Sequence, residues 1–287
     1  KTVTLETKLM YSEYLSRQTG AKVYLKPENM QFTGAYKVRG AYYKISTLSE
    51  EERKKGLITA SAGNHAQGVA YAASRFGAKA VIVMPTSTPL MKVNRTKSYG
   101  AEVVLYGDVY DEACAHAYQL AEEHGYTFIH PFDDEVVATG QGTIAMEIIK
   151  ELPLVDYILV PIGGGGLATG VSTLVKLLNP NIKVIGVEPA GANCMQESLK
   201  NGKVTTLPSV NTIADGTAVT AQVEVEMVNY VLNPSFEDED TSMWKVSYEG
   251  ENNPTDFQNK ADDAYTGDIA FHFWSGDSDM DFSIEQE

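Results

Sequence analysis

The sequence predicts an α/β protein with parallel sheets, followed by an acidic, β-rich tail. Short apolar strands alternate with helical segments of about 10–15 residues between residues 57 and 201, which is typical of parallel sheets with right-handed crossovers. The charge then changes abruptly, because residues 233–287 carry 15 acidic and two basic side chains, a net −13 of the chain's −15. Such a shift indicates a domain boundary. Several segments after residue 220 alternate apolar and polar residues, as half-buried antiparallel strands do.

We expect the elements in the following order. A strand within 22–29 ends in a turn, and a helix begins near Lys37. Strands then occupy 57–60, 80–84, 102–106, 126–129, 156–162 and 184–188. Helices occupy 64–76, 89–99, 109–124, 140–151, 167–178 and 194–201. In the tail, strands occupy 221–226, 243–248, 269–274 and 280–284.

The expected domains follow from these elements. Residues 1–40 and 139–214 form a large lobe, and residues 41–138 form a small α/β lobe. Residues 215–287 form the acidic β-rich segment.

Composition excludes several classes of function. No stretch approaches 18 continuous apolar residues, so we expect no membrane-spanning segment. The acidic charge disfavours nucleic-acid binding, which needs basic surface to displace counterions. Two cysteines, Cys114 and Cys194, are too few for a disulfide framework, which fits a reducing, cytoplasmic compartment.

Lys37 is the first candidate functional residue. It follows a short strand and stands just inside an expected helix start, close to backbone N–H groups and the positive end of a helix dipole. That setting favours the neutral amine that forms a Schiff base. The alternative is a surface lysine on an amphipathic helix.

The turn Ser61-Ala62-Gly63-Asn64-His65 is the second candidate. It joins a strand to a helix, where ligands of parallel sheets bind. Its backbone amides can hold a carboxylate at the helix N-terminus, with Asn64 adding an orienting amide. An ordinary capped turn is the alternative, and it would explain Ser61 and Gly63.

The run Gly163-Gly164-Gly165-Gly166 is the third candidate. It lies between an expected strand and an expected helix, so a flexible linker is the weaker interpretation. Four glycines allow close approach of the backbone to an anion, with a helix dipole behind. The run lacks the spaced G-x-G-x-x-G pattern, so a single phosphate is favoured over a dinucleotide. A lysine amine, a carboxylate site and a phosphate site together suit pyridoxal 5′-phosphate.

Several runs carry a family resemblance over about residues 7–215. They are 26–31 (KPENMQ), 33–40 (TGAYKVRG), 61–68 (SAGNHAQG), 140–143 (GQGT), 161–166 (PIGGGG) and 214–216 (ADG). In this order they resemble the threonine/serine dehydratase branch of the fold-type II pyridoxal-phosphate enzymes, most of all the biodegradative threonine ammonia-lyases. The resemblance implies dehydration and deamination of L-threonine or L-serine to a 2-oxo acid and ammonia.

The resemblance also implies residue roles. Lys37 would be the Schiff-base lysine and would remove the Cα proton, and Asn64 would contact the 3′-oxygen of the cofactor. Gly163–Gly166 would bind its phosphate, Gly216 would lie beside its ring, and Ser61–His65 would bind the substrate carboxylate. The similar serine racemases carry a second serine where this chain has Ala62, so dehydration is favoured over racemisation.

A cation site is a further expectation. In related enzymes a cation binds a Glu, a backbone carbonyl and an Asp, spaced as in Glu188, Ala192 and Cys194. Cys194 replaces the Asp, and a thiol is a poor ligand for a hard cation.

The family pattern ends at Asp215–Gly216. In the family, the last third of the core follows this point, together with a Ser or Cys that contacts the pyridine nitrogen. The sequence after Gly216 does not resemble that part, so we expect it to be missing from this chain. Without those strands and helices, we expect the sheet of the large lobe to have an exposed edge and missing cover.

The tail carries a second resemblance. Residues 233–238, Trp244 and residues 267–274 resemble the start of galactose-binding-like jelly-roll modules of secreted bacterial endo-galactanases. Trp244 and Trp274 would stack on sugars or pack in a core. Residues 237–240 are a solvated acidic cluster or a Ca²⁺ site.

We therefore hypothesise a composite chain joined within 213–222. The alternative function is a galactan-binding protein with an inactive α/β part. A homo-oligomer remains an alternative, because proteins of this fold class often form oligomers.

Overall fold

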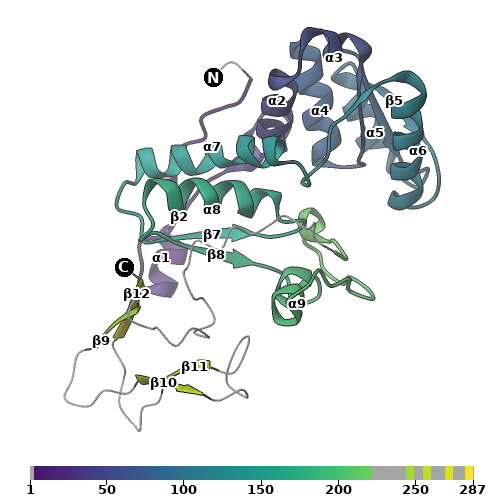
Figure 1. Cartoon of the computed structure of the whole chain (residues 1–287). Coiled ribbons are helices and arrows are strands. Elements are labelled where there is room, and N and C mark those ends of the chain that lie inside the picture. Colours follow the sequence, from purple (N-terminus) through teal and green to yellow (C-terminus); the bar gives the residue numbers. More distant parts are fainter. Residues whose placement is uncertain (1–2, 222–243, 249–254, 260–268, 274–281, 287) are drawn as a thin grey trace.

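The computed structural model describes residues 3–221, 244–248, 255–259, 269–273 and 282–286. Two parallel sheets and their covering helices make up residues 37–201 (Figure 1). The coarse prediction of an α/β protein with parallel sheets is therefore confirmed.

The first sheet is four-stranded and parallel, with order β5-β4-β3-β6. Its strands are β3 (Leu57–Ala60), β4 (Ala80–Met84), β5 (Glu102–Leu105) and β6 (Thr127–Phe128). Every residue of β3 and β4 is buried. The apolar runs in these strands thus form a sheet that is covered on both faces.

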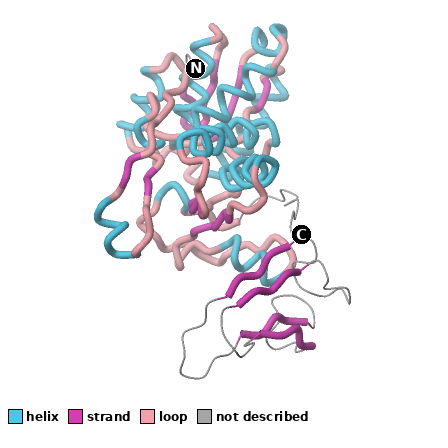
Figure 2. Tube along the Cα trace, turned by 90° about the vertical axis from the view of Figure 1, so that its left-hand side faces the viewer, coloured by secondary structure: helices cyan, strands magenta, loops and turns pink. Residues whose placement is uncertain are grey.

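Helices surround the strands of this sheet (Figure 2). They are α2 (Lys37–Thr47), α3 (Glu50–Lys55), α4 (Asn64–Arg75), α5 (Leu90–Ser98) and α6 (Tyr110–His124). One core cluster joins Ile45, Val69 and Ile82 on one face, and another joins Ile58 and Ala113 on the other. The alternation of side chains along each strand decides which core they enter.

The second sheet contains the parallel strands β7 (Tyr157–Pro161) and β8 (Lys183–Val187). Helix α8 (Gly166–Leu178) packs on it, and α7 (Glu135–Glu151) packs on α8 (Figure 1). A Cβ at Gly170 would lie 2.0 Å from the Ala138 carbonyl oxygen, so glycine permits this close crossing of α7 and α8. Helix α9 (Cys194–Asn201) follows β8.

The outer face of the β7–β8 sheet is exposed. Burial alternates along β7, with Ile158 and Val160 facing α8 and Tyr157 and Leu159 facing outward. Leu159 pairs with Ile185, and these side chains are 64% and 43% exposed. Parallel sheets are normally covered on both faces. The expectation of missing cover is confirmed for the described residues.

Elements near the N-terminus differ from the expected ones. Residues 22–29 hold only the short strand β2 (Tyr24–Leu25), paired antiparallel with β1 (Met10–Tyr11), and the 3-10 helix η1 (Glu28–Met30) follows. Helix α1 (Glu13–Thr19) was not predicted, although Ser12 caps it.

Two further helices correct the prediction. Helix α3 was not predicted either, although Ser49 and Glu52 form a capping box. Helix α7 begins at Glu135, five residues before the predicted start, because the Asp134 side chain accepts from the amides of Val136 and Val137.

The predicted lobe boundaries fall inside helices, since 40/41 lies within α2 and 138/139 lies within α7. The division into lobes stays a prediction. A second 3-10 helix, η2 (Asp215–Thr217), lies where the large lobe was expected to end.

In the tail, β9 (Trp244–Tyr248) pairs antiparallel with β12 (Phe282–Gln286), and β10 (Thr255–Asn259) pairs antiparallel with β11 (Ile269–Phe273). These are the antiparallel strands that alternation indicates, although β10 was not predicted. The predicted strand at 222–226 and Trp274 lie outside the described residues.

Ile158→Ala and Leu159→Ala form a matched pair on β7. Ile158 is 7% exposed and Leu159 is 64% exposed. We expect Ile158→Ala to lower the free energy of unfolding by about 2–4 kcal/mol, because it leaves a cavity under α8. Leu159→Ala should change it by less than about 0.5 kcal/mol. Urea unfolding measures both, and equal costs would show that the outer face is packed.

Candidate active site

Lys37 is the first residue of α2, as the sequence predicts. Its Nζ donates a hydrogen bond to the Pro131 carbonyl oxygen at 2.7 Å. The rings of Tyr36 and Phe132 lie with their centroids 5.8 and 5.6 Å from Nζ. Burial among these groups lowers the pKa of the Lys37 amine to about 8. The amine therefore has a substantial neutral fraction near physiological pH.

A buried ion cluster holds the start of α2 in place. Arg39, whose side chain is 2% exposed, contacts Glu28 in η1 and Glu147 in α7, each at 2.8 Å. Lys26 lies 2.6 Å from the other oxygen of Glu147. Two positive and two negative charges thus compensate one another inside the protein.

The hydrogen bonds of this cluster shift its pKa values. Burial alone would lower the pKa of Arg39, but the hydrogen bonds to Glu28 and Glu147 outweigh it and raise that pKa. Burial also acts to raise the pKa of Glu147, and its bonds to Arg39 and Lys26 lower it instead. Arg39 and Glu147 therefore both stay charged at neutral pH.

The run 140–143 joins α7 to α2. The Gly40 amide donates to Gln141 Oε1 at 3.1 Å, and Arg39 Nη1 lies 3.2 Å from Thr143 Oγ1. A Cβ at Gly140 would lie 2.7 Å from Gly40 Cα. Glycine at both positions therefore lets the two helices touch directly beside Lys37. The sequence resemblance included these residues but assigned no role to them.

The turn Ser61–His65 leaves β3 and starts α4. The Gly63 amide donates to Ser61 Oγ at 3.3 Å, and the first amide within α4 that bonds back along the chain is that of Gln67. The amides of Asn64, His65 and the next residue therefore have no helical partner and can meet an anion. Ala62 is half-buried, and the Asn64 side chain is exposed.

His65 points back into the protein. Its Nε2 lies 2.9 Å from the Ile129 carbonyl oxygen, so this nitrogen carries the proton and the buried Nδ1, which lacks a partner, carries the lone pair. Burial, together with the nearby Lys37 charge, lowers the pKa of His65 to about 3. A Cβ at Gly68 would lie 3.2 Å from the Lys37 carbonyl group, so α4 packs directly on the lysine backbone.

The glycine run forms the start of α8. Gly165 has a left-handed backbone at φ 95° and precedes the first helical residue, Gly166. The first amide that bonds within α8 is that of Thr169 at 2.9 Å, which leaves three earlier amides open. A Cβ at Gly163 would lie 3.3 Å from the Gly216 carbonyl oxygen. The run and Gly216 are therefore neighbours.

The segment 129–134 connects these parts and was missed by sequence reasoning. Its carbonyl groups bind His65 and Lys37, at Ile129 and Pro131 respectively. Phe132 contacts the glycine run, since a Cβ at Gly164 would lie 2.7 Å from its ring. The signal that could have found this segment is Asp134, an N-cap residue placed just before an apolar helical pattern.

The residues present fit a pyridoxal phosphate. An amine without a carboxylate partner can form a covalent bond, and open amides at a helix start suit a phosphate. The buried Nδ1 of His65 also lacks a hydrogen-bond partner among the described residues and could accept from a polar group.

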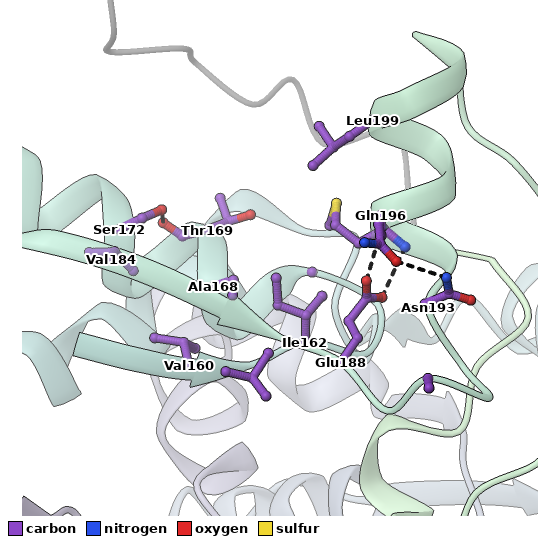
Figure 3. A pocket seen from close by; sticks show the side chains of 15 residues that line it. Val160, Ile162, Ala168, Thr169, Ser172, Val184, Glu188, Asn193, Gln196 and Leu199 are labelled. Atoms are coloured by element: carbon purple, nitrogen blue, oxygen red, sulfur yellow. Dashed lines mark hydrogen bonds between the residues drawn. The ribbon is translucent and has the colours of Figure 1, made fainter. Parts of the chain in front are cut away.

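The residues proposed for a cation have other partners. Both oxygens of Glu188 accept hydrogen bonds at 2.9 Å, from the amides of Met195 and Gln196 at the start of α9 (Figure 3). Cys194 Sγ lies 3.9 Å from Glu188 Oε1, and Ala192 is buried. The described ranges contain no group of three or more His, Cys, Asp or Glu side chains suited to a metal.

Glu188 also borders a cavity of about 710 Å³ between β7, β8, α8 and α9 (Figure 3). Gly165 lines it, but Lys37 and the turn 61–65 do not. The cavity therefore adjoins the glycine run at Gly165 but not the lysine, and Met195, which also lines it, lies 3.4 Å from a Cβ placed at Gly165.

Fold and site together define an α/β protein with a buried lysine amine and a glycine-rich helix start, both in contact with Phe132. The family model described as pyridoxal-phosphate dependent enzyme matches residues 2–237, and the chain belongs to this family. The match extends 21 residues beyond Gly216, where the sequence pattern was expected to end. None of the helices in the described ranges has the length and apolarity needed to span a bilayer.

Similar proteins include L-threonine ammonia-lyase of Thermotoga maritima, which is 51% identical over 76% of this chain and 55% of that protein. The catabolic L-threonine dehydratase TdcB of Staphylococcus aureus is 46% identical over 79% of this chain and 66% of its own length. The first curated relatives are thus matched over about half of their length.

Solved structures with a similar fold support the same family. The processed form of threonine deaminase isoform 2 from Solanum lycopersicum superimposes with a TM-score of 0.76 at 48% identity, covering 78% of this chain and 61% of that one. Maize serine racemase gives a TM-score of 0.75 at 38% identity, covering 77% and 67%.

Arg39→Met tests the ion cluster. We expect it to lower the free energy of unfolding by about 3–5 kcal/mol, because Glu28 and Glu147 are left buried without their partner. Arg17→Met is the control, since Arg17 pairs with Glu13 on the surface of α1 and its loss should cost less than about 0.5 kcal/mol. Urea unfolding compares the two, and similar costs would mean that the cluster contributes nothing special.

His65→Gln tests the buried imidazole. The pKa of His65 is about 3 in the folded chain against 6.5 in the unfolded chain, so the unfolded state binds the extra proton between these values. Stability should therefore be complete above pH 6.5 and fall by about 1.4 kcal/mol per pH unit below it. Unfolding between pH 7 and 5 measures this slope. The same slope in His65→Gln would assign it to other groups.

Proposed function

We propose that this chain carries the lysine site of a pyridoxal-phosphate-dependent ammonia-lyase for L-threonine or L-serine, which releases a 2-oxo acid and ammonia. The observation that carries the proposal is the Lys37 amine, whose pKa is lowered to about 8 and whose aromatic neighbour Phe132 contacts the glycine run. The names of relatives at 51% and 46% identity support the reaction. Because the chain spans about half the length of those first relatives, the whole activity is a proposal for this chain.

The proposed roles are those that the family resemblance implies, and the contacts of the described residues are compatible with them. The cofactor, when bound to Lys37, supplies a conjugated ring that withdraws electrons from the substrate Cα. Lys37, with a pKa near neutrality, is suited to take the proton from Cα. The open amides at the start of α4 bind the substrate carboxylate, and Asn64 orients the cofactor.

The phosphate and ring contacts complete the proposed site. The amides of Gly163–Gly166 bind phosphate at the start of α8, and Gly216 lies beside the ring. Glu188 and Ala192 are weaker candidates for a cation, since the Glu188 carboxylate already caps α9.

Ala62 favours elimination over racemisation. Racemisation needs a second base on the opposite face of Cα, and the methyl side chain of Ala62 cannot carry a proton. The likeness to maize serine racemase therefore supports the fold and the cofactor rather than that activity.

Sugar binding by the tail and assembly into an oligomer are separate proposals. The antiparallel pairs β9–β12 and β10–β11 are compatible with a jelly-roll module, but sugar binding, a composite origin and a homo-oligomer rest on sequence resemblance alone. Retention on a galactan column without lyase activity would favour the carbohydrate-binding alternative.

Lys37→Ala tests the site directly. Pyridoxal phosphate added to the wild-type chain should give visible absorbance from covalently bound cofactor, increasing about tenfold in rate per pH unit up to pH 8 as the amine loses its proton. Lys37→Ala should abolish both this signal and 2-oxo acid formation from threonine.

The matched control is Lys54→Ala, which removes an exposed amine on α3. It should leave both signals unchanged. Cofactor absorbance that persists in Lys37→Ala would disprove the assignment.

A further inference from the structure

Phe132 lies between the two halves of the proposed site. Its ring centroid is 5.6 Å from Lys37 Nζ, and the same ring would contact a Cβ at Gly164 at 2.7 Å. Its carbonyl oxygen would lie 2.9 Å from a Cβ at Gly166. Glycine at 164 and 166 is therefore required by Phe132, independently of any phosphate.

The backbone around Phe132 is held on several sides. His130 Nδ1 accepts from the Asp133 amide at 2.7 Å and from the Phe132 amide at 3.4 Å. Asp134 caps α7 and pairs with Lys44 of α2 at 2.6 Å. These contacts fix the backbone that carries the Phe132 ring relative to both α2 and α7.

We propose that Phe132 is a positioning residue that excludes water from the Lys37 amine and fixes its spacing from the glycine run. The catalytic purpose of this role rests on the proposed function, whereas the contacts of Phe132 with Lys37 and the glycine run do not depend on it. The amine is otherwise enclosed by the Tyr36 ring and the Pro131 carbonyl group.

The charges around Lys37 support a dry site. The Lys37 charge acts on His65 of α4 and His130 of the turn, and burial lowers the pKa of both, so both are neutral at pH 7. Burial raises the pKa of the neighbouring Tyr36 to about 12, so its hydroxyl is neutral as well. Within residues 3–221, the salt bridges join side chains other than that of Lys37. Burial is therefore the cause of the lowered amine pKa, and Phe132 is one of the two rings that provide it.

The test is the pKa of the Lys37 amine in the chain without cofactor. Acetylation of Lys37 at a series of pH values, followed by peptide mass spectrometry, gives this pKa, with exposed Lys54 as internal reference. Wild type should titrate near pH 8. Phe132→Leu should raise the pKa by about one unit, because a smaller side chain admits water. Gly164→Ala should shift it in the same direction by displacing the ring.

Phe128→Leu is the matched control. Phe128 stacks on Tyr118 with centroids 4.2 Å apart and lies 6.1 Å from the His130 ring. The rings beside the Lys37 amine are those of Tyr36 and Phe132, so the same substitution at Phe128 should leave the Lys37 pKa unchanged. Phe132→Leu should also weaken pyridoxal phosphate binding about tenfold, measured as Kd by absorbance titration.

An unchanged Lys37 pKa in Phe132→Leu and Gly164→Ala would overturn the proposal, even if cofactor binding is lost. If wild type binds no pyridoxal phosphate, the proposed function fails, while a raised amine pKa in Phe132→Leu still supports the role of the ring.

Discussion

The contact between Arg39 and its two carboxylates is the constraint on which the site depends. Arg39 lies two residues after Lys37, so the same helical turn that carries the reactive amine is tied to η1 and α7. Separate removal of any charge would leave another buried without compensation. The cluster therefore fixes where α2 begins, and with it the direction of Lys37.

The glycine run satisfies two requirements at once. Gly165 adopts a left-handed backbone that starts α8, and Gly164 and Gly166 leave room for Phe132. Open amides at the same helix start then suit an anion. The same glycine run thus serves both the packing of Phe132 and an anion site. A substitution at Gly164 or Gly166 would disturb both, so its effect on packing has to be measured separately from its effect on anion binding.

Much of this was predictable from the sequence. The order of strands and helices after residue 57 and the start of α2 near Lys37 follow from local patterns and from the family runs. Capped helices such as α3 were predictable from the Ser49–Glu52 box but were missed. The Asp134 cap could have marked the end of segment 129–134, but the contacts of this segment with Lys37 and His65 were not predictable, because backbone carbonyl groups leave no side-chain signal.

The outer face of the sheet formed by β7 and β8 is apolar and is left uncovered by the described residues. Side chains such as Leu159 and Ile185 have the composition of a core but the exposure of a surface. The contacts of the Lys37 amine nevertheless lie within residues 36–132.

The most direct test of this account is chemical trapping. The chain is mixed with pyridoxal phosphate, reduced with borohydride, digested and mapped by mass spectrometry. We predict that the cofactor is found on the peptide that contains Lys37 and is nearly absent elsewhere. Equal labelling of exposed lysines such as Lys54 would contradict the claim that burial and the Arg39 cluster make Lys37 the reactive amine.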